Sequence, residues 1–309
     1  MINNFWLKLS KPIVALAPMA GYTDSAFRLL CREFGADVVY SEMISVDGLC
    51  YKNKKTLDLL KFNSKECPLV FQLFGTDPDK FASAVKIINK IIAHHPVGID
   101  INFGCPAPKV AQNGAGAALM NDLNKSYKII QAVCDNSQLP VSIKIRAGIK
   151  NVSALDFIKK VKNLPWAAVM IHGRTLKQGF NGDIDCDLIK KIKTLIPDKI
   201  VLANGGLNSL EDAKDILNKT GADGLGLARG VIGNPWLFQE IKNNRSINTT
   251  LAERKKIILR HAKLFLKDNN NLIPLRKHLV HYFKGQKNAS GWRQKIIQAE
   301  TLSGIKSII

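Results

Sequence analysis

Short apolar runs rich in β-branched residues recur at fairly regular intervals along the chain. Runs of this length and composition predict buried β-strands. The segments between them repeat apolar residues at helical spacing, which predicts helices over 79–93, 153–163 and 210–219. Strand and helix alternating in this way predict a (β/α)8 barrel rather than an open doubly wound sheet. The eight strand runs cover residues 13–19, 38–43, 69–75, 98–104, 141–148, 168–175, 200–206 and 224–230.

Each strand run ends in polar residues or in special ones, such as glycines or the Pro18-Met19-Ala20 turn. In a (β/α)8 barrel the carboxyl ends of the strands meet at one face, and that face carries the active site. One polar residue at a strand end is often an ordinary core group with a satisfied hydrogen bond. Polar or special residues at the end of every run predict a single functional site instead. These residues are Pro18, Met19, Ala20, Glu42, Gln72, Asn102, Cys105, Lys144, Arg146, His172, Arg174, Asn204, Gly205, Gly206 and Arg229.

The pattern changes after the last strand run. We expect the barrel to occupy residues 1–241, followed by a linker over 242–250. Residues 251–309 show helical periodicity throughout, which predicts a small all-helical C-terminal domain.

Basic residues are concentrated in that C-terminal region. The whole chain has 45 Lys and Arg against 25 Asp and Glu, a net charge of +20. Residues 251–309 hold 13 basic and 3 acidic side chains, so about half of the excess lies there. A basic helix surface is often simply solvated. The regional imbalance instead favours a polyanionic partner, and nucleic acid is the commonest.

The cysteines and histidines do not form a recognisable metal or disulfide pattern. No C-x-x-C pair occurs, which fits a reducing, cytoplasmic setting. His278 and His281 lie one helical turn apart without a nearby carboxylate or Cys, so no metal site is expected. The apolar run 12–20 follows Lys8 and Lys11 as in a signal peptide, but it is short and forms part of a predicted strand and active site, so we expect no cleavage. No apolar run is long enough for a membrane span. The cysteines are Cys31, Cys50, Cys67, Cys105, Cys134 and Cys186.

Two glycine-rich turns follow the seventh and eighth strand runs, over 204–209 and 228–234. In this barrel fold the loops at those places often bind a phosphate. Glycines let backbone N–H groups approach an anion closely, and Arg229 adds a fixed positive charge. The alternative is that these glycines only turn the chain.

Lys144 and Arg146 alternate on one strand, so both point to the same side. Two cations on the inward face of an apolar strand need an anionic or electron-rich partner, such as a reduced flavin. Gln72 and Asn204 offer amide donors and acceptors suited to the edge of a flavin or a pyrimidine. His172 can donate to the same carbonyls, although a lone strand histidine is more often structural.

Cys105 stands at a Gly-Cys-Pro corner directly after a strand run. A nucleophilic role needs a histidine partner, and a metal-binding role needs companion ligands. A general acid needs only an exposed, protonated thiol, and a free thiol with a pKa of about 8.5 is protonated at neutral pH. The general-acid role is therefore the simplest interpretation.

Several of these motifs together resemble the tRNA-dihydrouridine synthases, in order and over essentially the whole chain. The C-terminal segments "RKH" (276–278) and "WRQKI" (292–296) are most similar to the bacterial B-type branch. Phe103 and Gly206 depart from the family, which often has Met and Asp at those positions. The matching motifs are "APMAGYTD" (17–24), "SEM" (41–43), "DINFGCP" (100–106), "NGAGAAL" (113–119), "KIRAG" (144–148), "IHGRT" (171–175), "NGG" (204–206) and "ARGVIGNPWLF" (228–238).

The resemblance implies an FMN-bound barrel, a helical tRNA-binding domain and NADPH as reductant. It implies flavin contacts from Pro18, Met19 and Ala20 through their backbone, from Gln72, Lys144 and His172 at the ring, and from Asn204, Gly205, Gly206, Ala228 and Arg229 at the phosphate. Asn102, Arg146 and Arg174 are then expected at the uracil, with Cys105 as the acid.

The implied reaction is reduction of the C5=C6 bond of a D-loop uridine to 5,6-dihydrouridine. NADPH reduces FMN, hydride passes from flavin N5 to uracil C6, and Cys105 protonates C5. The uridine has to leave its stack, at a cost of a few kcal/mol. No obligate protein partner is indicated. Two alternatives stay open: an FMN barrel acting on a small molecule such as dihydroorotate, and a non-catalytic RNA-binding protein.

Overall fold

The strands of the computed structural model, which describes residues 4–92, 95 and 97–309, close into a barrel. All eight run parallel, in the order β1-β10-β9-β8-β5-β4-β3-β2. Each predicted run overlaps one barrel strand, so the predicted (β/α)8 barrel is confirmed. The strands are β1 (Ile13–Leu16), β2 (Val38–Ser45), β3 (Leu69–Phe74), β4 (Val97–Phe103), β5 (Val141–Arg146), β8 (Ala168–His172), β9 (Ile200–Asn204) and β10 (Gly224–Leu227).

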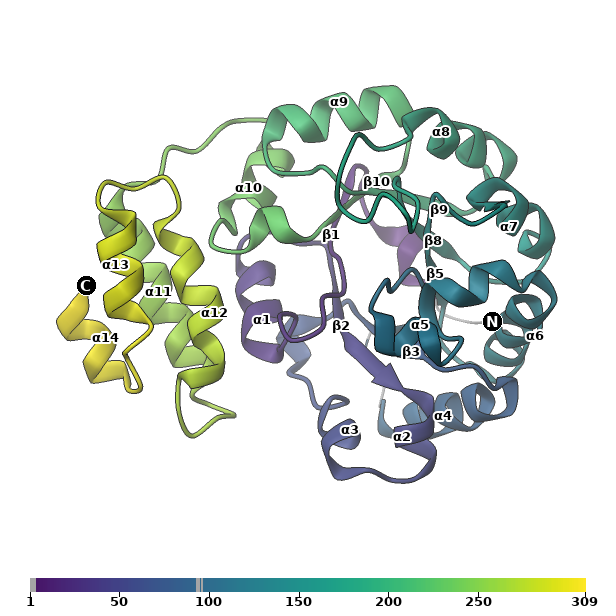
Figure 1. Ribbon diagram of the computed structural model, residues 1–309, viewed down its shortest axis with the longest axis horizontal. Coiled ribbons are helices and arrows are strands. Elements are labelled where there is room, and N and C mark those ends of the chain that lie inside the picture. The colour runs from purple at the N-terminus through teal and green to yellow at the C-terminus, as the bar shows by residue number, and fades with distance from the viewer. Residues whose placement is uncertain (1–3, 93–94, 96) are drawn as a thin grey trace.

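Helices surround the barrel, and Figure 1 shows them as a ring around the strands. The larger ones are α1 (Ser25–Glu33), α4 (Pro78–Ile91), α6 (Leu123–Asn136), α7 (Ala154–Val161), α8 (Cys186–Leu195), α9 (Leu210–Thr220) and α10 (Trp236–Asn243). The shorter elements are η1 (Phe5–Lys8), α2 (Val46–Cys50), α3 (Lys54–Asp58), η2 (Ser64–Glu66), α5 (Pro108–Gln112), η3 (Gly116–Asn121), η4 (Arg229–Val231) and a hairpin of β6 (Gly148–Ile149) with β7 (Val152–Ser153).

Capping residues set the ends of the predicted helices. Ser153 forms a capping box with Asp156, so it stands just before α7 rather than within it. Ser209 caps α9 in the same way, and the left-handed Gly221 ends that helix. The predicted helix 79–93 corresponds to α4, and its residue 93 lies outside the described residues.

Two apolar clusters pack the barrel on either side of its wall. The larger one lies between the strands and the outer helices. The smaller one fills the barrel interior and includes Phe5, Trp6, Tyr40 and Met170. Because η1 supplies Phe5 and Trp6, the amino ends of the strands are closed by apolar side chains. Only the carboxyl ends are left to form a polar site.

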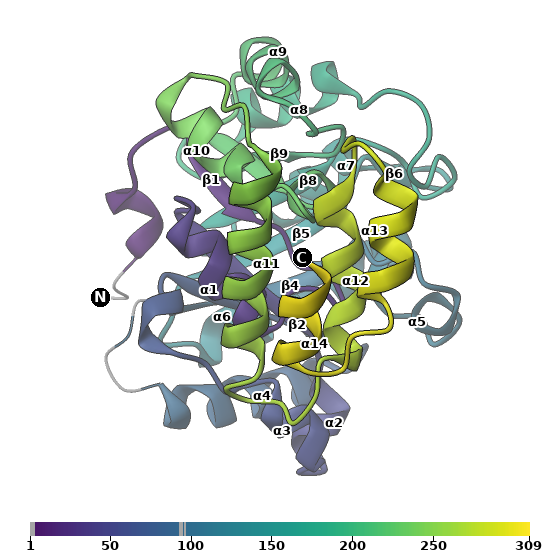
Figure 2. The same cartoon turned by 90° about the vertical axis from the view of Figure 1, so that its left-hand side faces the viewer.

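The C-terminal region is all-helical, as predicted, and packs beside α1 (Figures 1 and 2). Its elements are α11 (Leu251–Phe265), η5 (Ile273–Leu275), α12 (Arg276–Leu279), η6 (Val280–Phe283), α13 (Ala289–Ile296) and α14 (Leu302–Ile308). Buried side chains of these helices belong to the same apolar cluster as the outer layer of the barrel.

The segment between α10 and α11 contains no helix or strand, although α10 itself continues to Asn243. Thr250 caps α11 and forms a capping box with Glu253. The division into a barrel of residues 1–241, a linker of 242–250 and a domain of 251–309 stays a prediction. Across the described residues, we find no helix with both the length and the apolar character needed to cross a bilayer.

Candidate active site

A cavity of about 550 Å³ lies at the carboxyl ends of the barrel strands. Every site residue predicted from the sequence lines it, although these residues come from many separate segments. They are Pro18, Met19, Ala20, Gln72, Asn102, Cys105, Lys144, Arg146, His172, Arg174, Asn204, Gly205, Gly206, Ala228 and Arg229. Glu42, another polar strand end, is not a lining residue. Its carboxylate accepts a hydrogen bond from Gly21 N and so holds the loop after β1.

The register of the parallel strands explains this convergence. Gln72 pairs with Asp100, and Asn102 pairs with Lys144 one strand further around. Arg146 pairs with His172, which in turn pairs with Asn204. Neighbouring strands therefore present their polar residues at one level of the barrel.

A chain of side-chain amides connects the barrel interior to Cys105. Gln72 Nε2 donates to Asp100 Oδ2 at 2.7 Å, and Asn102 Nδ2 donates to Gln72 Oε1 at 2.8 Å. Asn102 Oδ1 accepts from the backbone N of both Gly104 and Cys105, at 3.0 and 2.9 Å. The orientation of Gln72 thus fixes that of Asn102, which in turn fixes the corner carrying the thiol.

Asp100 is a site residue that the sequence reasoning missed. It is fully buried, and its second oxygen accepts from Ser142 Oγ at 2.7 Å. Burial raises the pKa of Asp100 to about 6, against the lowering effect of its bonds to Gln72 and Ser142. The sequence did hold a signal for Asp100, because an acidic residue inside an apolar strand run is unusual and needs a partner.

Lys144 is held within the barrel by Asn204. Its Nζ donates to Asn204 Oδ1 at 3.2 Å, and Asn204 Nδ2 donates to Gly226 O at 2.6 Å. Burial and the nearby charge of Arg146 lower the pKa of Lys144 to about 8, while Asp100 acts in the opposite direction. Lys144 is therefore mostly protonated at neutral pH, and no carboxylate of the described residues is hydrogen-bonded to it.

His172 is neutral at physiological pH. Burial, followed by the charges of Lys144, Arg146 and Arg174, lowers its pKa to about 3. Its Nδ1 accepts from Arg174 N at 3.3 Å, which places the single ring proton on Nε2. The ring can therefore offer one N–H donor to a group bound in the cavity.

Arg146 and Arg174 use much of their hydrogen-bonding capacity on backbone carbonyls. Arg146 Nε donates to Gly104 O at 2.9 Å, and its Nη1 donates to Thr175 O and Gly179 O at 3.2 and 3.0 Å. Arg174 Nε donates to Gly182 O at 2.6 Å. Both arginines brace the loop after β8, so a contact with substrate would be an additional role.

Phe180, on the loop after β8, is a second residue that the sequence reasoning missed. Its ring centroid lies 4.1 Å from Arg229 Cζ and 5.8 Å from Arg146 Cζ, and the ring forms a T-shaped pair with His172. The side chain is 51% exposed even though it lines the cavity. No periodicity marks an isolated aromatic residue in a loop, so the sequence held no signal for it.

The two glycine-rich turns form one wall of the cavity. Gly205 and Gly206 have φ values of +106° and +71°, a conformation that lets successive N–H groups converge on an anion. A Cβ on Gly230 would lie 2.1 Å from Leu207 O, so the second turn packs directly on the first. Arg229 lines the cavity beside them. These turns suit the phosphate end of a bound ligand.

Other lining residues outside the predicted set include Tyr22, Met43, Ile232 and His281. His281 belongs to the C-terminal helices, and its spacing from His278 in the sequence suggests only a metal site, which is not expected. No group of three His, Cys, Asp or Glu side chains among the described residues is placed to hold a metal ion.

Comparisons with known proteins agree on a family. The family model described as Dihydrouridine synthase (Dus) matches residues 15–307. A "Probable tRNA-dihydrouridine synthase" of Helicobacter pylori (strain ATCC 700392 / 26695) is 35% identical over 303 residues, which cover 97% of this chain and 90% of that protein. The "tRNA-dihydrouridine synthase B" of Vibrio vulnificus (strain CMCP6) is 33% identical over 320 residues, covering 98% and 97%.

Solved structures match the fold at low sequence identity. A histamine dehydrogenase from Rhizobium sp. 4-9 has a TM-score of 0.55 and 13% identity, and the match covers 82% of this chain and 49% of that one. This chain therefore corresponds to about half of that larger protein, and the likeness supports the barrel alone. The family model and the relatives together establish the wider relationship: the chain belongs to the dihydrouridine synthase family.

Proposed function

We propose that this protein is an FMN-dependent, NADPH-driven tRNA-dihydrouridine synthase that reduces the C5=C6 bond of a D-loop uridine. The observation that carries the proposal is the position of Cys105 at a cavity that also contains Lys144, His172 and Arg229, in a chain of this family. The substrate would place the enzyme in the cytoplasm.

The cavity residues fit a flavin mononucleotide. Gly205, Gly206 and Arg229 suit a phosphate, since they combine a left-handed glycine turn with a cation. Lys144 suits the electron-rich side of the ring, and the Nε2 proton of His172 suits a ring carbonyl. We assign Gln72 to the ring and Asn204 and Ala228 to the ribityl phosphate, with Pro18, Met19 and Ala20 lining the flavin through their backbone. When bound, the flavin supplies the hydride that adds to uracil C6.

Cys105 holds the proton for uracil C5 in this proposal. Its thiol is half-buried, and its backbone is fixed on both sides, by Asn102 Oδ1 and by Ala117 N, which donates to Cys105 O at 3.1 Å. The S–H bond breaks as the C5–H bond forms, and the thiolate then takes a proton from solvent. A fixed corner at the substrate is positioning catalysis, because the acid need not search for its target.

Asn102, Arg146 and Arg174 are proposed to face the uracil. Asn102 already accepts from the backbone N of Cys105. A contact of Asn102 with the uracil would therefore fix the position of the base relative to the Cys105 thiol. Arg146 joins Gly104 to the loop after β8 and lines the same wall.

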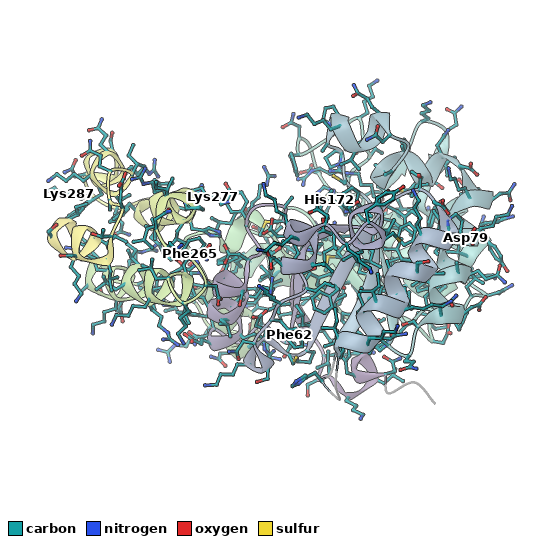
Figure 3. The ribbon with its side chains drawn as sticks, turned by 90° about the horizontal axis from the view of Figure 1, so that it is seen from below. Phe62, Asp79, His172, Phe265, Lys277 and Lys287 are labelled. Carbon is teal, nitrogen blue, oxygen red and sulfur yellow. The ribbon has the colours of Figure 1, made fainter. Side chains whose placement is uncertain are left out.

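The C-terminal helices are proposed to bind tRNA. They carry 13 of the 45 basic residues and only 3 acidic ones. Lys277 Nζ lies 5.3 Å from the ring centroid of Tyr22, which lines the cavity, so basic surface continues to the mouth of the site. Figure 3 shows Lys277 on the side of these helices that faces the barrel and Lys287 far from it. A small-molecule substrate would leave this basic surface without a role.

The proposal is tested with purified protein, NADPH and tRNA from a strain lacking dihydrouridine synthases. We expect a yellow protein that releases FMN, and new dihydrouridine in the tRNA by nucleoside mass spectrometry. NADH in place of NADPH tests the reductant. Turnover of free uridine or dihydroorotate, with none on tRNA, would refute the proposal, as would protein that never binds flavin.

A further inference from the structure

One residue of the cavity wall comes from the C-terminal helices. His281 lies in η6, yet it lines the same cavity as Cys105 and Lys144. Tyr22, from the loop after β1, and Ile232, from the loop after β10, are also lining residues. The barrel therefore does not enclose its own site completely, and the C-terminal helices contribute to the wall.

The position of His281 is fixed by direct backbone packing on the barrel. A Cβ on Gly233 would lie 2.3 Å from His281 C and 2.4 Å from His281 O, so only a glycine allows this approach. Arg254 Nη1 donates to Gly233 O at 3.4 Å and to Tyr282 O at 3.2 Å. The loop after β10 and η6 are thus joined at His281 and at the residue that follows it.

The ring of His281 has unused hydrogen-bonding capacity. His261, deeper in the same helices, has its Nδ1 3.0 Å from Tyr282 Oη, whereas His281 has no ring hydrogen bond within the described part of the chain. Partial burial and the charges of Arg293 and Lys284 lower the pKa of His281, so its ring is neutral at physiological pH. A neutral imidazole offers one donor and one acceptor, which suits a nucleoside better than a phosphate.

We propose that His281 is a substrate-binding residue that hydrogen-bonds the nucleoside entering the cavity, so that the C-terminal helices complete the catalytic pocket. This inference rests on the proposed function. Flavin contacts are assigned to barrel residues alone, so His281 acts on the substrate half of the reaction and not on the cofactor half.

Substitution of His281 separates those two halves. In His281→Ala we expect unchanged flavin content and an unchanged rate of flavin reduction by NADPH without tRNA. We expect kcat/KM for tRNA to fall about tenfold, the scale of one neutral hydrogen bond. His281→Gln, which restores an amide donor and acceptor, should recover part of that loss.

A matched pair of glycine variants tests the same role without altering the ring. Gly233 and Gly285 have nearly equal φ values of +74° and +76°, so an alanine strains both backbones alike. Only Gly233 has a close neighbour, while a Cβ on Gly285 meets nothing within 4 Å. We expect Gly233→Ala to displace His281 and to lower kcat/KM for tRNA, with Gly285→Ala close to the wild type.

The outcomes distinguish this inference from the proposed function. If the wild type makes no dihydrouridine in tRNA, the proposed function fails. If the wild type is active but His281→Ala keeps its kcat/KM, only the inference about His281 fails. Loss of flavin from His281→Ala, or no recovery in His281→Gln, would also overturn it, because either result indicates a structural role.

Discussion

At the scale of single residues, charge in the barrel interior is arranged around Lys144. Asp100 lies below the cavity and is shielded by Gln72 and Ser142, which both donate to it. Its negative charge raises the pKa of Lys144, whereas burial and Arg146 lower it. The protonation of Lys144 therefore depends on the carboxylate of Asp100, which does not line the cavity.

Asp100→Asn should expose this dependence. Without the carboxylate, the pKa of Lys144 falls below its value of about 8, so less of the lysine is protonated at pH 7 to 8. We expect FMN affinity, measured by fluorescence titration of flavin-free protein, to decline at a lower pH than in the wild type. Lys144→Arg is the control, because arginine stays charged across this range. Equal alkaline declines in wild type and Asp100→Asn would contradict the assignment.

Cys105→Ala tests the proton donor. The flavin should remain bound and NADPH should still reduce it, since no flavin contact is assigned to the thiol. Dihydrouridine formation should fall by about 100-fold or more, the usual contribution of a general acid. Cys186→Ala, at the start of α8 and outside the cavity, should retain wild-type activity. A Cys105→Ala variant with wild-type turnover would show that the proton comes from elsewhere.

At the scale of elements, barrel closure depends on the pairing of β1 with β10. These strands pair from Ile13 with Gly224 to Leu16 with Leu227. A Cβ on Gly224 would lie 2.1 Å from Ile13 O and 2.7 Å from Ile13 N, so the strands approach too closely there for any side chain. The glycines of the last strand run thus have a packing reason as well as a place near the site.

Gly224→Ala should weaken this closure. We expect the free energy of unfolding to fall by about 3 kcal/mol, the upper range for overpacking, because the clash is with backbone that cannot rotate away. Gly221→Ala is the comparison, since its φ of +61° costs about 1 kcal/mol but its Cβ meets nothing within 4 Å. Urea unfolding measures both. Equal losses of unfolding free energy in the two variants would mean that β1 and β10 can shift to make room for the added methyl group.

Lys277 links two elements, α12 and the loop after β1, at the mouth of the cavity. If it contacts a tRNA phosphate, Lys277→Ala should reduce the slope of log affinity against log salt concentration by about 1. Lys86→Ala on α4, which changes the same charge on the outer face of the barrel, should leave the slope unchanged. Identical slopes for Lys277→Ala and wild type would show that Lys277 does not contact a tRNA phosphate.

The sequence predicted the strands well, because a buried parallel strand is a continuous apolar run that periodicity detects. The polar strand ends other than Glu42 also line one cavity, because the carboxyl ends of the strands meet at one face of the barrel. Phe180 and His281 were missed because their positions depend on loop conformation and on docking of the C-terminal helices, which leave no local pattern. The bonds of Arg146 to Thr175 and Gly179 likewise follow only from tertiary structure.

At the scale of the whole molecule, aromatic side chains join the C-terminal helices to the barrel. The Phe27 ring of α1 lies 5.6 Å from that of His261 and 4.6 Å from that of His278, measured between centroids. Both histidines are fully buried, and burial is the main cause that lowers their pKa, to about 3 for His261. Both histidines therefore pack as neutral rings at the seam, meaning the contact of α1 with the C-terminal helices around Phe27.

The seam should make the protein sensitive to acid. Between pH 6.5 and 3 the unfolded chain protonates His261 and the folded chain does not, so stability is greatest above pH 6.5 and falls as pH decreases. The loss from His261 alone is about 2 kcal/mol at pH 5. Asp24 and Asp100, whose pKa values are raised to about 6, act in the opposite sense.

His261→Phe isolates this contribution. The variant loses the bond to Tyr282, so it should be less stable at pH 8, but its free energy of unfolding should depend less steeply on pH between 6 and 4, by up to one proton. Urea titrations across that range measure both slopes. Parallel slopes in the two proteins would show that His261 does not titrate on unfolding.

The packing of Phe27 against His261 and His278, whose own ring centroids lie 4.9 Å apart, also limits modular exchange. A C-terminal segment transplanted onto another barrel would bring His261 and His278 against an α1 surface that was not shaped for them. The transplanted helices would also need a glycine at position 233 of the barrel, because the backbone of His281 packs directly against it. A working chimera would therefore have to carry α1 and the loop after β10 together with the helices, so the unit that can be inherited or engineered as a whole is discontinuous in the sequence.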